Sequence, residues 1–284
     1  MVYAGQTAFL TGGASGIAKA VTEMLVENGI KVYVADRDLK GAQAVAEQLN
    51  NGKSSQMVWA VEVDAADWDS QRKAFETAEA EFGRIDYVFP IAGLGERRSF
   101  PNRPDSKGYE KPDLTLLDVN CTGVIYTCWL GVQHFRRQPV NKYGFRGKIT
   151  PVASVCGFYI HKPIPVYTAA KHAIVGFVRS YGSILIEENI ALNTVCPNKV
   201  RTGISTTAVY DKAEKLGVLV PMKHVLEAFE MTLGDSKLAG QIIEVAPQIG
   251  PNIRPPAAWI NEESRLSAEM TYARSHHLHE PVKD

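Results

Sequence analysis

The 284-residue sequence has few cysteines, no excess of charge of either sign and no long apolar run. Its four cysteines stand far apart without a Cys-x-x-Cys pair, which indicates reduced, buried thiols and not a disulfide framework. For Cys156, two residues after Ser154, the alternative that it lines a pocket stays open. Lys plus Arg and Asp plus Glu number 31 each, so the composition gives no indication of binding to nucleic acid or to an anionic membrane.

Membrane-spanning and export signals are also missing. No apolar stretch reaches the roughly 18 residues that cross a bilayer, and the N-terminal residues show no signal-peptide pattern. We therefore expect a cytoplasmic protein without a membrane span.

Repeats, low-complexity blocks and linkers are absent as well, and strands alternate with helices along the chain. This alternation predicts an α/β protein: a single doubly wound Rossmann-type domain over residues 1–250, with a seven-stranded parallel sheet and helices on both faces. Residues 251–284 are predicted to form a polar, Pro-containing C-terminal extension. That extension carries His276, His277 and His279, but no further ligands at metal-binding spacing accompany them, so we predict no metal site. The predicted strands cover residues 7–10, 31–35, 56–63, 85–90, 147–153, 190–195 and 240–245.

A glycine-rich turn follows the first strand and precedes a helix. Gly12 and Gly16 permit a tight turn with close backbone approach, and the helix N-terminus behind them presents free N–H groups that suit a pyrophosphate. Gly12, Ser15, Gly16 and Ile17 are therefore candidate cofactor-binding residues. Such turns also serve merely as connectors, so the motif needs support from elsewhere in the chain.

The second strand supplies that support because it ends in Asp36, about twenty residues after the turn. A carboxylate at this position accepts hydrogen bonds from a ribose 2′-hydroxyl and repels a 2′-phosphate. This predicts NAD as the cofactor over NADP. The neighbouring Arg37 could soften the repulsion, which leaves NADP as the alternative.

Two further strand ends should lie at the same edge of the sheet. Asp64 and Ala65 follow the third strand and are expected to flank an adenine, and Asp64 could at the same time cap a helix that begins near Asp67. Ala92 and Gly93 follow the fourth strand, and their small side chains permit close approach by a nicotinamide riboside.

The sixth strand leads into residues 196–202, where backbone groups near Val200 and the hydroxyl of Thr202 are suited to the carboxamide of a nicotinamide. Residues 203–217 have the small and polar composition of a mobile flap. Residues 94–113 form a polar, Pro-containing segment that is either an insertion at the mouth of a site or a solvated loop.

Tyr167 and Lys171 stand four residues apart at the start of a predicted helix and share one face. A cation held near a phenol favours the phenolate and lowers its pKa, and Ser154 could hydrogen-bond the oxygen of an alcohol or ketone at the same point. Alone, the pair could also be an ordinary helix face. Asn120, a polar residue in an apolar helix, either bonds backbone or orders water.

Taken together, these motifs resemble the short-chain dehydrogenase/reductase family over residues 5–250, and most closely its NAD-dependent hydroxyprostaglandin dehydrogenase branch. The turn at residues 11–18, Asp64 and a catalytic tetrad occur in register, with Ser154 thirteen residues before Tyr167. The tetrad members are Asn120, Ser154, Tyr167 and Lys171.

The resemblance implies a role for each of these residues. Tyr167 would be the acid/base, and Lys171 would lower its pKa and hold the nicotinamide ribose. Ser154 would bind the substrate oxygen, and Asn120 would order a water in a proton relay. Dimers or tetramers are common in the family, and the apolar stretches 121–130 and 174–186 suit such a homodimer or homotetramer.

Three positions depart from the family pattern. Ala18 replaces the third glycine of the turn. Residues 90–93 read Pro-Ile-Ala-Gly where the family has Asn-Asn-Ala-Gly, which removes two amides that brace the sheet. Asn198 replaces a glycine after the sixth strand and tolerates a positive φ better than most residues.

The function that we predict is the NAD-dependent oxidation of a secondary alcohol to a ketone. The apolar residues between Ser154 and Tyr167 favour a hydrophobic small molecule, of terpenoid, steroid, polyketide or fatty-acid type. The alternatives are an NADPH-dependent ketone reductase, a dinucleotide-binding regulator without turnover, and a cofactor-assisted isomerase or cyclase. The apolar residues in question are Phe158, Tyr159, Ile160 and Ile164.

Overall fold

The computed structural model of the protein describes residues 2–281. The chain divides into two compact units, of which the first ends at Ile253 and the second begins at Arg254. No helix within residues 2–281 is both long and apolar enough to cross a membrane.

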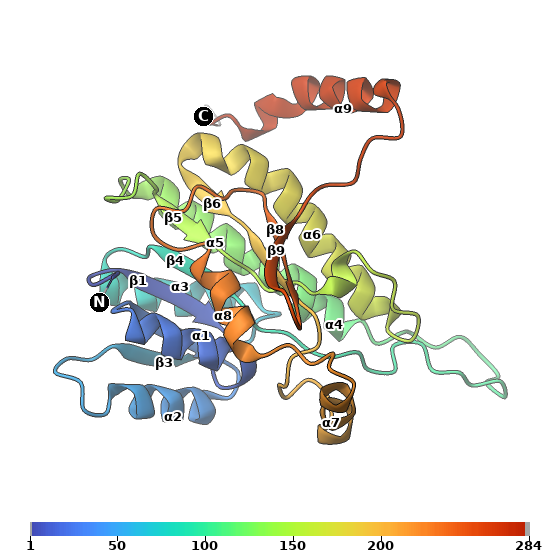
Figure 1. Ribbon diagram of the computed structural model, residues 1–284, viewed down its shortest axis with the longest axis horizontal. Coiled ribbons are helices and arrows are strands. Elements are labelled where there is room, and N and C mark those ends of the chain that lie inside the picture. The colour runs from blue at the N-terminus through green and yellow to red at the C-terminus, as the bar shows by residue number, and fades with distance from the viewer. Residues whose placement is uncertain (1, 282–284) are drawn as a thin grey trace. The chain divides into compact units, whose positions relative to one another are not determined.

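A parallel sheet of six strands organises the first unit (Figure 1), and its strand order is β3-β2-β1-β4-β5-β6. Every residue of β1 is buried, as expected of a central strand covered on both faces. Successive residues of β1 face opposite sides, so Phe9 joins one core cluster and Leu10 the other. The strands are β1 (Thr7–Thr11), β2 (Lys31–Asp36), β3 (Val58–Glu62), β4 (Tyr87–Pro90), β5 (Gly147–Ile149) and β6 (Ile190–Leu192).

Helices cover both faces of this sheet, as the sequence predicted (Figure 1). Their apolar side chains recur at helical spacing: Val21 and Leu25 lie one turn apart, and so do Ile174 and Val178. One face is covered by α1 (Gly16–Glu27), α2 (Leu39–Asn50) and α8 (Met222–Glu230), and the other by α3 (Trp68–Phe82), α5 (Val124–Arg137) and α6 (Pro165–Leu185).

The number of strands differs from the predicted seven, because the strand expected over residues 190–195 is divided at Asn193. The Asn193 N–H still bonds the Ile149 carbonyl of β5 at 3.0 Å, and its side chain accepts from the Gln241 N–H at 3.0 Å and donates to the Leu238 carbonyl at 2.8 Å. Asn193 therefore stands where the chain changes its partner strand. Beyond it, the chain enters a second sheet of order β7-β8-β9, in which β8 is the strand predicted over residues 240–245. The new strands are β7 (Thr194–Pro197), β8 (Ile242–Ala246) and β9 (Gly250–Arg254).

The long helix predicted over residues 116–135 is interrupted by a wider turn. It consists of α4 (Thr115–Leu117), a π-helical turn η1 (Asp118–Gly123) that contains Asn120, and α5. Gly123 permits this turn to lie against the backbone after β3, because a Cβ there would fall 2.1 Å from the Ala65 oxygen. Gln71 bridges the contact by donating to the carbonyls of Ala65 and Gly123 at 2.6 and 2.8 Å.

Two segments that were predicted to be irregular contain helices. The segment 203–217 holds α7 (Thr207–Lys215), and the C-terminal extension holds α9 (Glu262–Ser275) and the short η4 (His276–His279). Asn261 begins α9 because its side chain accepts from the Ser264 N–H at 2.9 Å, a cap that the compositional interpretation overlooked. Among residues 2–281, no group of three or more His, Cys, Asp or Glu side chains is arranged to hold a metal ion.

Candidate active site

The site residues gather at the carboxyl ends of the strands, where β1 and β4 are neighbours and the strand order reverses. Ligands of open α/β sheets bind at such a point. Gly12 has φ +83°, and a Cβ there would lie 2.8 Å from the Ala92 Cα. Gly12 is therefore required both for the turn and for its close contact with the end of β4.

Helix α1 begins at this turn with its first N–H groups uncapped by a side chain. Its N-cap residue Ser15 is exposed and makes no side-chain capping bond. Gly16 has φ +58°, and a Cβ there would lie 3.4 Å from Thr202, so the turn faces the segment after β7. Ser15, Gly16 and Ile17 therefore present the free donors that a pyrophosphate requires.

Asp36 ends β2 and holds the glycine turn. One carboxylate oxygen accepts from the Ala14 N–H and the other from the Asp38 N–H, both at 2.9 Å. The carboxylate is half-buried, and its oxygens keep further acceptor capacity for a ribose hydroxyl. Arg37 is exposed beside it.

Asp64 and Ala65 follow β3 but serve partly structural roles. The exposed Asp64 carboxylate accepts from the Ala66 N–H at 2.9 Å. Asp67, and not Asp64, caps α3, because its side chain accepts from the Ser70 N–H at 2.6 Å. The capping role considered for Asp64 is thus wrong, and its adenine-side role stays a prediction.

The segment after β4 is held by two side chains from other elements. Thr11 Oγ1 accepts from the N–H groups of Ile91 and Ala92 at 3.2 and 3.3 Å. Asn120 exchanges two bonds of 2.7 Å with the backbone of Leu94, and its amide oxygen would lie 3.3 Å from a Cβ on Gly93. Of the two possibilities for Asn120, the structure shows the bond to backbone.

Ser154, Tyr167 and Lys171 converge between β5, β7 and the start of α6. Ser154 begins the short helix η2 (Val155–Gly157), where its buried hydroxyl accepts from the Cys156 N–H at 3.2 Å. The Lys171 Nζ lies 5.5 Å from the centroid of the Tyr167 ring and donates to the Val152 carbonyl at 3.0 Å. Tyr167 and Cys121 of the π-helical turn both pack against a small apolar cluster that joins α6 to α4 and η1.

Burial dominates the electrostatics of this pair. It raises the pKa of Tyr167 to about 12, against a lowering by the hydrogen bond with the Ser154 hydroxyl. Burial also lowers the pKa of Lys171, which is 3% exposed, to about 8. The net direction for the tyrosine pKa is thus opposite to the expected one, because desolvation outweighs the influence of neighbouring groups.

Val200 and Thr202 lie where the segment after β7 passes the glycine turn. Val200 is buried and pairs with Val220. The Thr202 hydroxyl lies 3.2 Å from the hydroxyl of Tyr210, a buried residue of α7 whose oxygen also accepts from the Ser205 N–H at 3.1 Å. Among the non-glycine residues within 2–281, only Asn189 has a positive φ. Asn198 therefore does not adopt the left-handed conformation that we considered for it.

The sequence interpretation missed three residues that organise the site: Thr11, Glu96 and Tyr210. Glu96, from the insertion at residues 94–113, accepts from the backbone N–H of Tyr167 at 2.6 Å. Of the three, only Thr11 carried a local signal, since it directly precedes the glycine turn.

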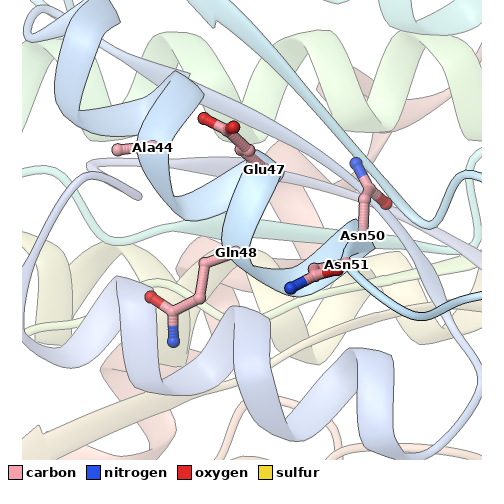
Figure 2. Close-up of a pocket in the computed structure, with 5 residues that line it drawn as sticks. All are labelled: Ala44, Glu47, Gln48, Asn50 and Asn51. Atoms are coloured by element: carbon pink, nitrogen blue, oxygen red, sulfur yellow. The ribbon is translucent and has the colours of Figure 1, made fainter.

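A surface hollow lies along α2 and contains none of these residues (Figure 2). Asn50 uses its amide to hold the Met57 and Val58 backbone, with bonds of 2.7 to 3.0 Å. Asn50 therefore stabilises the fold, and the hollow contains none of the candidate catalytic residues. Its lining residues are Ala44, Glu47, Gln48, Asn50 and Asn51.

Comparison with known proteins identifies the family. The family model described as short chain dehydrogenase matches residues 6–213. The chain is 29% identical over 246 residues to the 15-hydroxyprostaglandin dehydrogenase [NAD(+)] of Rattus norvegicus, covering 85% of this chain and 86% of the relative. With the human protein of that name it shares 30% identity over 221 residues, covering 77% and 76%.

Solved structures share the fold at lower identity. The 3-ketoacyl-(acyl-carrier-protein) reductase of Brucella melitensis, complexed with NADH, superposes with a TM-score of 0.73 at 23% identity, covering 86% of this chain and 98% of that chain. Because the family model spans well over half of the residues and the relatives cover most of the chain, this protein belongs to the short-chain dehydrogenase family of oxidoreductases.

Proposed function

We propose that this protein oxidises a hydrophobic secondary alcohol to a ketone with NAD as the cofactor. The observation that carries the proposal is the Asp36 carboxylate at the end of β2, held against the glycine turn by the Ala14 N–H. A fixed negative charge there accepts a ribose 2′-hydroxyl and repels a 2′-phosphate. The naming of the rat and human relatives as NAD(+) enzymes supports the same cofactor.

The residues present fit a dinucleotide at this edge. The absence of a side chain at Gly12 and the uncapped start of α1 suit a pyrophosphate, and Thr202, which faces Gly16, would supply a hydroxyl to the nicotinamide carboxamide. When bound, the nicotinamide supplies the hydride acceptor.

Three side chains would handle the alcohol itself. The Ser154 hydroxyl would hydrogen-bond the alcohol oxygen, and Tyr167 in its phenolate form would accept the alcohol proton. Lys171, fixed by the Val152 carbonyl, places a cation near the Tyr167 ring, where it would stabilise the phenolate that accepts the proton. Asn120 would hold the segment after β4 in place, because both its amide oxygen and its amide nitrogen bond Leu94.

The cofactor preference can be measured directly by calorimetry with NADH and NADPH. Asp36→Ala would remove both the negative charge and the acceptor for the Ala14 N–H. Asp36→Asn removes the charge alone, because its amide oxygen can still accept the bond from Ala14, and it is therefore the better test. We expect wild-type protein to bind NADH at least about tenfold more tightly than NADPH, and Asp36→Asn to narrow this ratio. Arg37→Ala, next in the chain, is the matched control and should leave or widen the preference for NADH.

If the protein bound neither NADH nor NADPH, the proposal would be contradicted. If it preferred NADPH, ketone reduction would replace alcohol oxidation as the proposed function.

One observation favours ketone reduction as the second candidate function. A phenol whose pKa burial raises to about 12 is protonated at neutral pH, which is the form that donates a proton to a ketone. A substrate panel of 2-octanol, 1-phenylethanol and cyclohexanol, with their ketones, separates the two directions.

The proposed substrate class is supported by apolar side chains in the segment that joins Ser154 to Tyr167. Ile160 is 85% exposed in the bend before α6, and Phe158 and Tyr159 precede it. Apolar side chains in this segment suit a hydrophobic alcohol. The rat and human relatives are named for a hydroxyprostaglandin, which is itself a hydrophobic secondary alcohol.

We also propose that the protein acts in the cytoplasm as a homodimer or homotetramer. Trp129 on α5 is 40% exposed, and the guanidinium of Arg136 covers its ring at 5.6 Å. Trp is enriched at the core of protein–protein interfaces, so this exposed side chain is available to a partner subunit. Light scattering of the purified protein tests the oligomeric state, since the mass of a monomer would contradict the proposed homodimer or homotetramer.

A further inference from the structure

The catalytic helix lacks a cap of its own. Ile164, the N-cap residue of α6, provides no side-chain acceptor, and Pro165 at the first position has no N–H group. The N–H groups of the first helical turn must find partners outside the helix. For Tyr167 the partner is Glu96 Oε2, at 2.6 Å and 71 residues away in the sequence.

Glu96 is itself held in place. Its other carboxylate oxygen accepts from the hydroxyl of Ser99 at 3.2 Å, and Ser99 is 2% exposed. The Ser99 N–H donates to the Arg97 carbonyl at 2.8 Å and so closes a tight turn over residues 97–99, directly after Glu96. The carboxylate therefore reaches Tyr167 from an ordered turn.

The segment 94–99 contacts three elements of the site. Leu94 is paired with Asn120 in the π-helical turn. Gly95 passes close to Ile204 after β7, because a Cβ on Gly95 would lie 3.0 Å from that side chain. Glu96 reaches the start of α6. One short segment thus links the two catalytic elements with the segment that carries Thr202.

We propose that Glu96 is a positioning residue that fixes the orientation of Tyr167 and so couples the insertion 94–113 to catalysis. The inference rests on the proposed function, since it assigns the role of that same tyrosine. A bond to the backbone N–H of Tyr167 fixes the direction of its Cα–Cβ bond. The phenol oxygen lies several ångströms from the Cα, so a rotation of about 10° moves it by about 1 Å, enough to slow a proton transfer about 100-fold.

A carboxylate at this position also interacts favourably with the helix. The first turn of α6 carries the positive end of the helix dipole, and it contains no acidic residue of its own. Glu96 supplies both the acceptor and the negative charge that such a helix start favours.

The test compares Glu96→Ala with Glu96→Gln. Glutamine keeps an acceptor for the Tyr167 N–H, and alanine removes it. The matched control is Glu110→Ala in the same insertion, which removes an exposed carboxylate that pairs with Arg103 at 2.9 Å, away from the site. The readouts are amide hydrogen exchange of the peptide containing Tyr167, and kcat and KM with NAD and 2-octanol, 1-phenylethanol or cyclohexanol.

We expect Glu96→Ala to lose the exchange protection of the Tyr167 amide and to lower kcat about 10-fold or more, with KM for NAD changed less than about 3-fold. Glu96→Gln should restore most of the protection and of kcat, and Glu110→Ala should match wild type. Unchanged exchange in Glu96→Ala overturns the proposal whatever the activity, and so does lost protection with unchanged kcat. A wild type that oxidises none of the three alcohols overturns the proposed oxidation and, with it, the role of Glu96 in that reaction. A wild type that does oxidise them, with either of the two contrary results for Glu96→Ala, overturns the role of Glu96 alone. The wild-type activity therefore tells the two failures apart.

Discussion

Burial sets the protonation states of the two residues at the centre of the site. It raises the pKa of Tyr167 to about 12 and lowers that of Lys171 to about 8, so each group is driven toward its neutral form. Alcohol oxidation requires the tyrosine to accept a proton, and the lysine cation assists only while it remains charged.

These directions predict the pH profile of the oxidation. Below the pKa of Tyr167 the phenolate fraction grows tenfold for each pH unit, so the rate should rise from about pH 6 to about pH 8. Above about pH 8 Lys171 loses its charge, and the slope should flatten. The measurement is kcat/KM for 2-octanol against pH with saturating NAD. Tyr167→Phe serves as the control and should lower the rate about 100-fold or more while retaining NADH binding. A rate that falls between pH 6 and 8 would contradict this assignment.

Thr11 holds the segment that follows β4. Its hydroxyl accepts two N–H groups from the segment after β4. Thr11→Val keeps the shape but leaves both N–H groups without this acceptor. The free energy of unfolding should fall by about 1–3 kcal/mol, and NADH binding should weaken by about tenfold. Denaturant unfolding and calorimetry measure the two effects.

Thr22→Val is the matched control for Thr11→Val. Thr22 is fully buried too, but its hydroxyl bonds the Ala18 carbonyl within α1. We expect it to alter stability without weakening NADH binding more than about twofold. If the two variants weakened NADH binding equally, the specific role of Thr11 would be refuted.

At the scale of elements, hydrophobic periodicity predicts the strands and long helices of the first unit well. The short apolar run of the fully buried β1 and the 3.6-residue spacing of apolar residues in α6 follow directly from the sequence. The interruptions were not predictable in this way. The π-helical turn depends on Gly123 meeting Ala65, and the division at Asn193 depends on partners at Leu238 and Gln241. Such contacts join residues distant in sequence, and periodicity carries no information about them.

Helix α7 is the element that turns a predicted flap into an ordered part of the site. Tyr210→Phe removes the hydroxyl that meets Thr202 and Ser205 and leaves the ring in its buried position. Because Thr202 faces Gly16, we expect the KM for NAD to rise about 3- to 10-fold with little change in thermal stability. Steady-state kinetics with varied NAD test this. An unchanged KM would separate α7 from cofactor binding.

At the scale of the whole molecule, topology explains why the candidate site could be assembled from sequence. In a parallel sheet all carboxyl ends share one edge, so positions near residues 12, 36, 64 and 92 come together once the strand order is known. The strand order does not predict which side chains contact one another at this edge. Glu96 with Tyr167, and Thr202 with Tyr210, pair residues from different loops, and loop conformation does not follow from the strand pattern.

The C-terminal unit provides the last prediction. None of the residues of α9 is buried, so this helix contributes no apolar core, whereas Phe229 of α8 is fully buried in the first unit. A chain ending at Ala258 retains β9 and should unfold within about 3 °C of the full chain, because loss of exposed residues changes stability little. Phe229→Ala, as the positive control, should cost about 3–5 kcal/mol and lower Tm by roughly 10 °C. Thermal unfolding with light scattering on all three proteins measures this. A truncated chain that melts as early as the Phe229 variant would show that residues 259–284 stabilise the fold through contacts that the burial within α9 does not reveal.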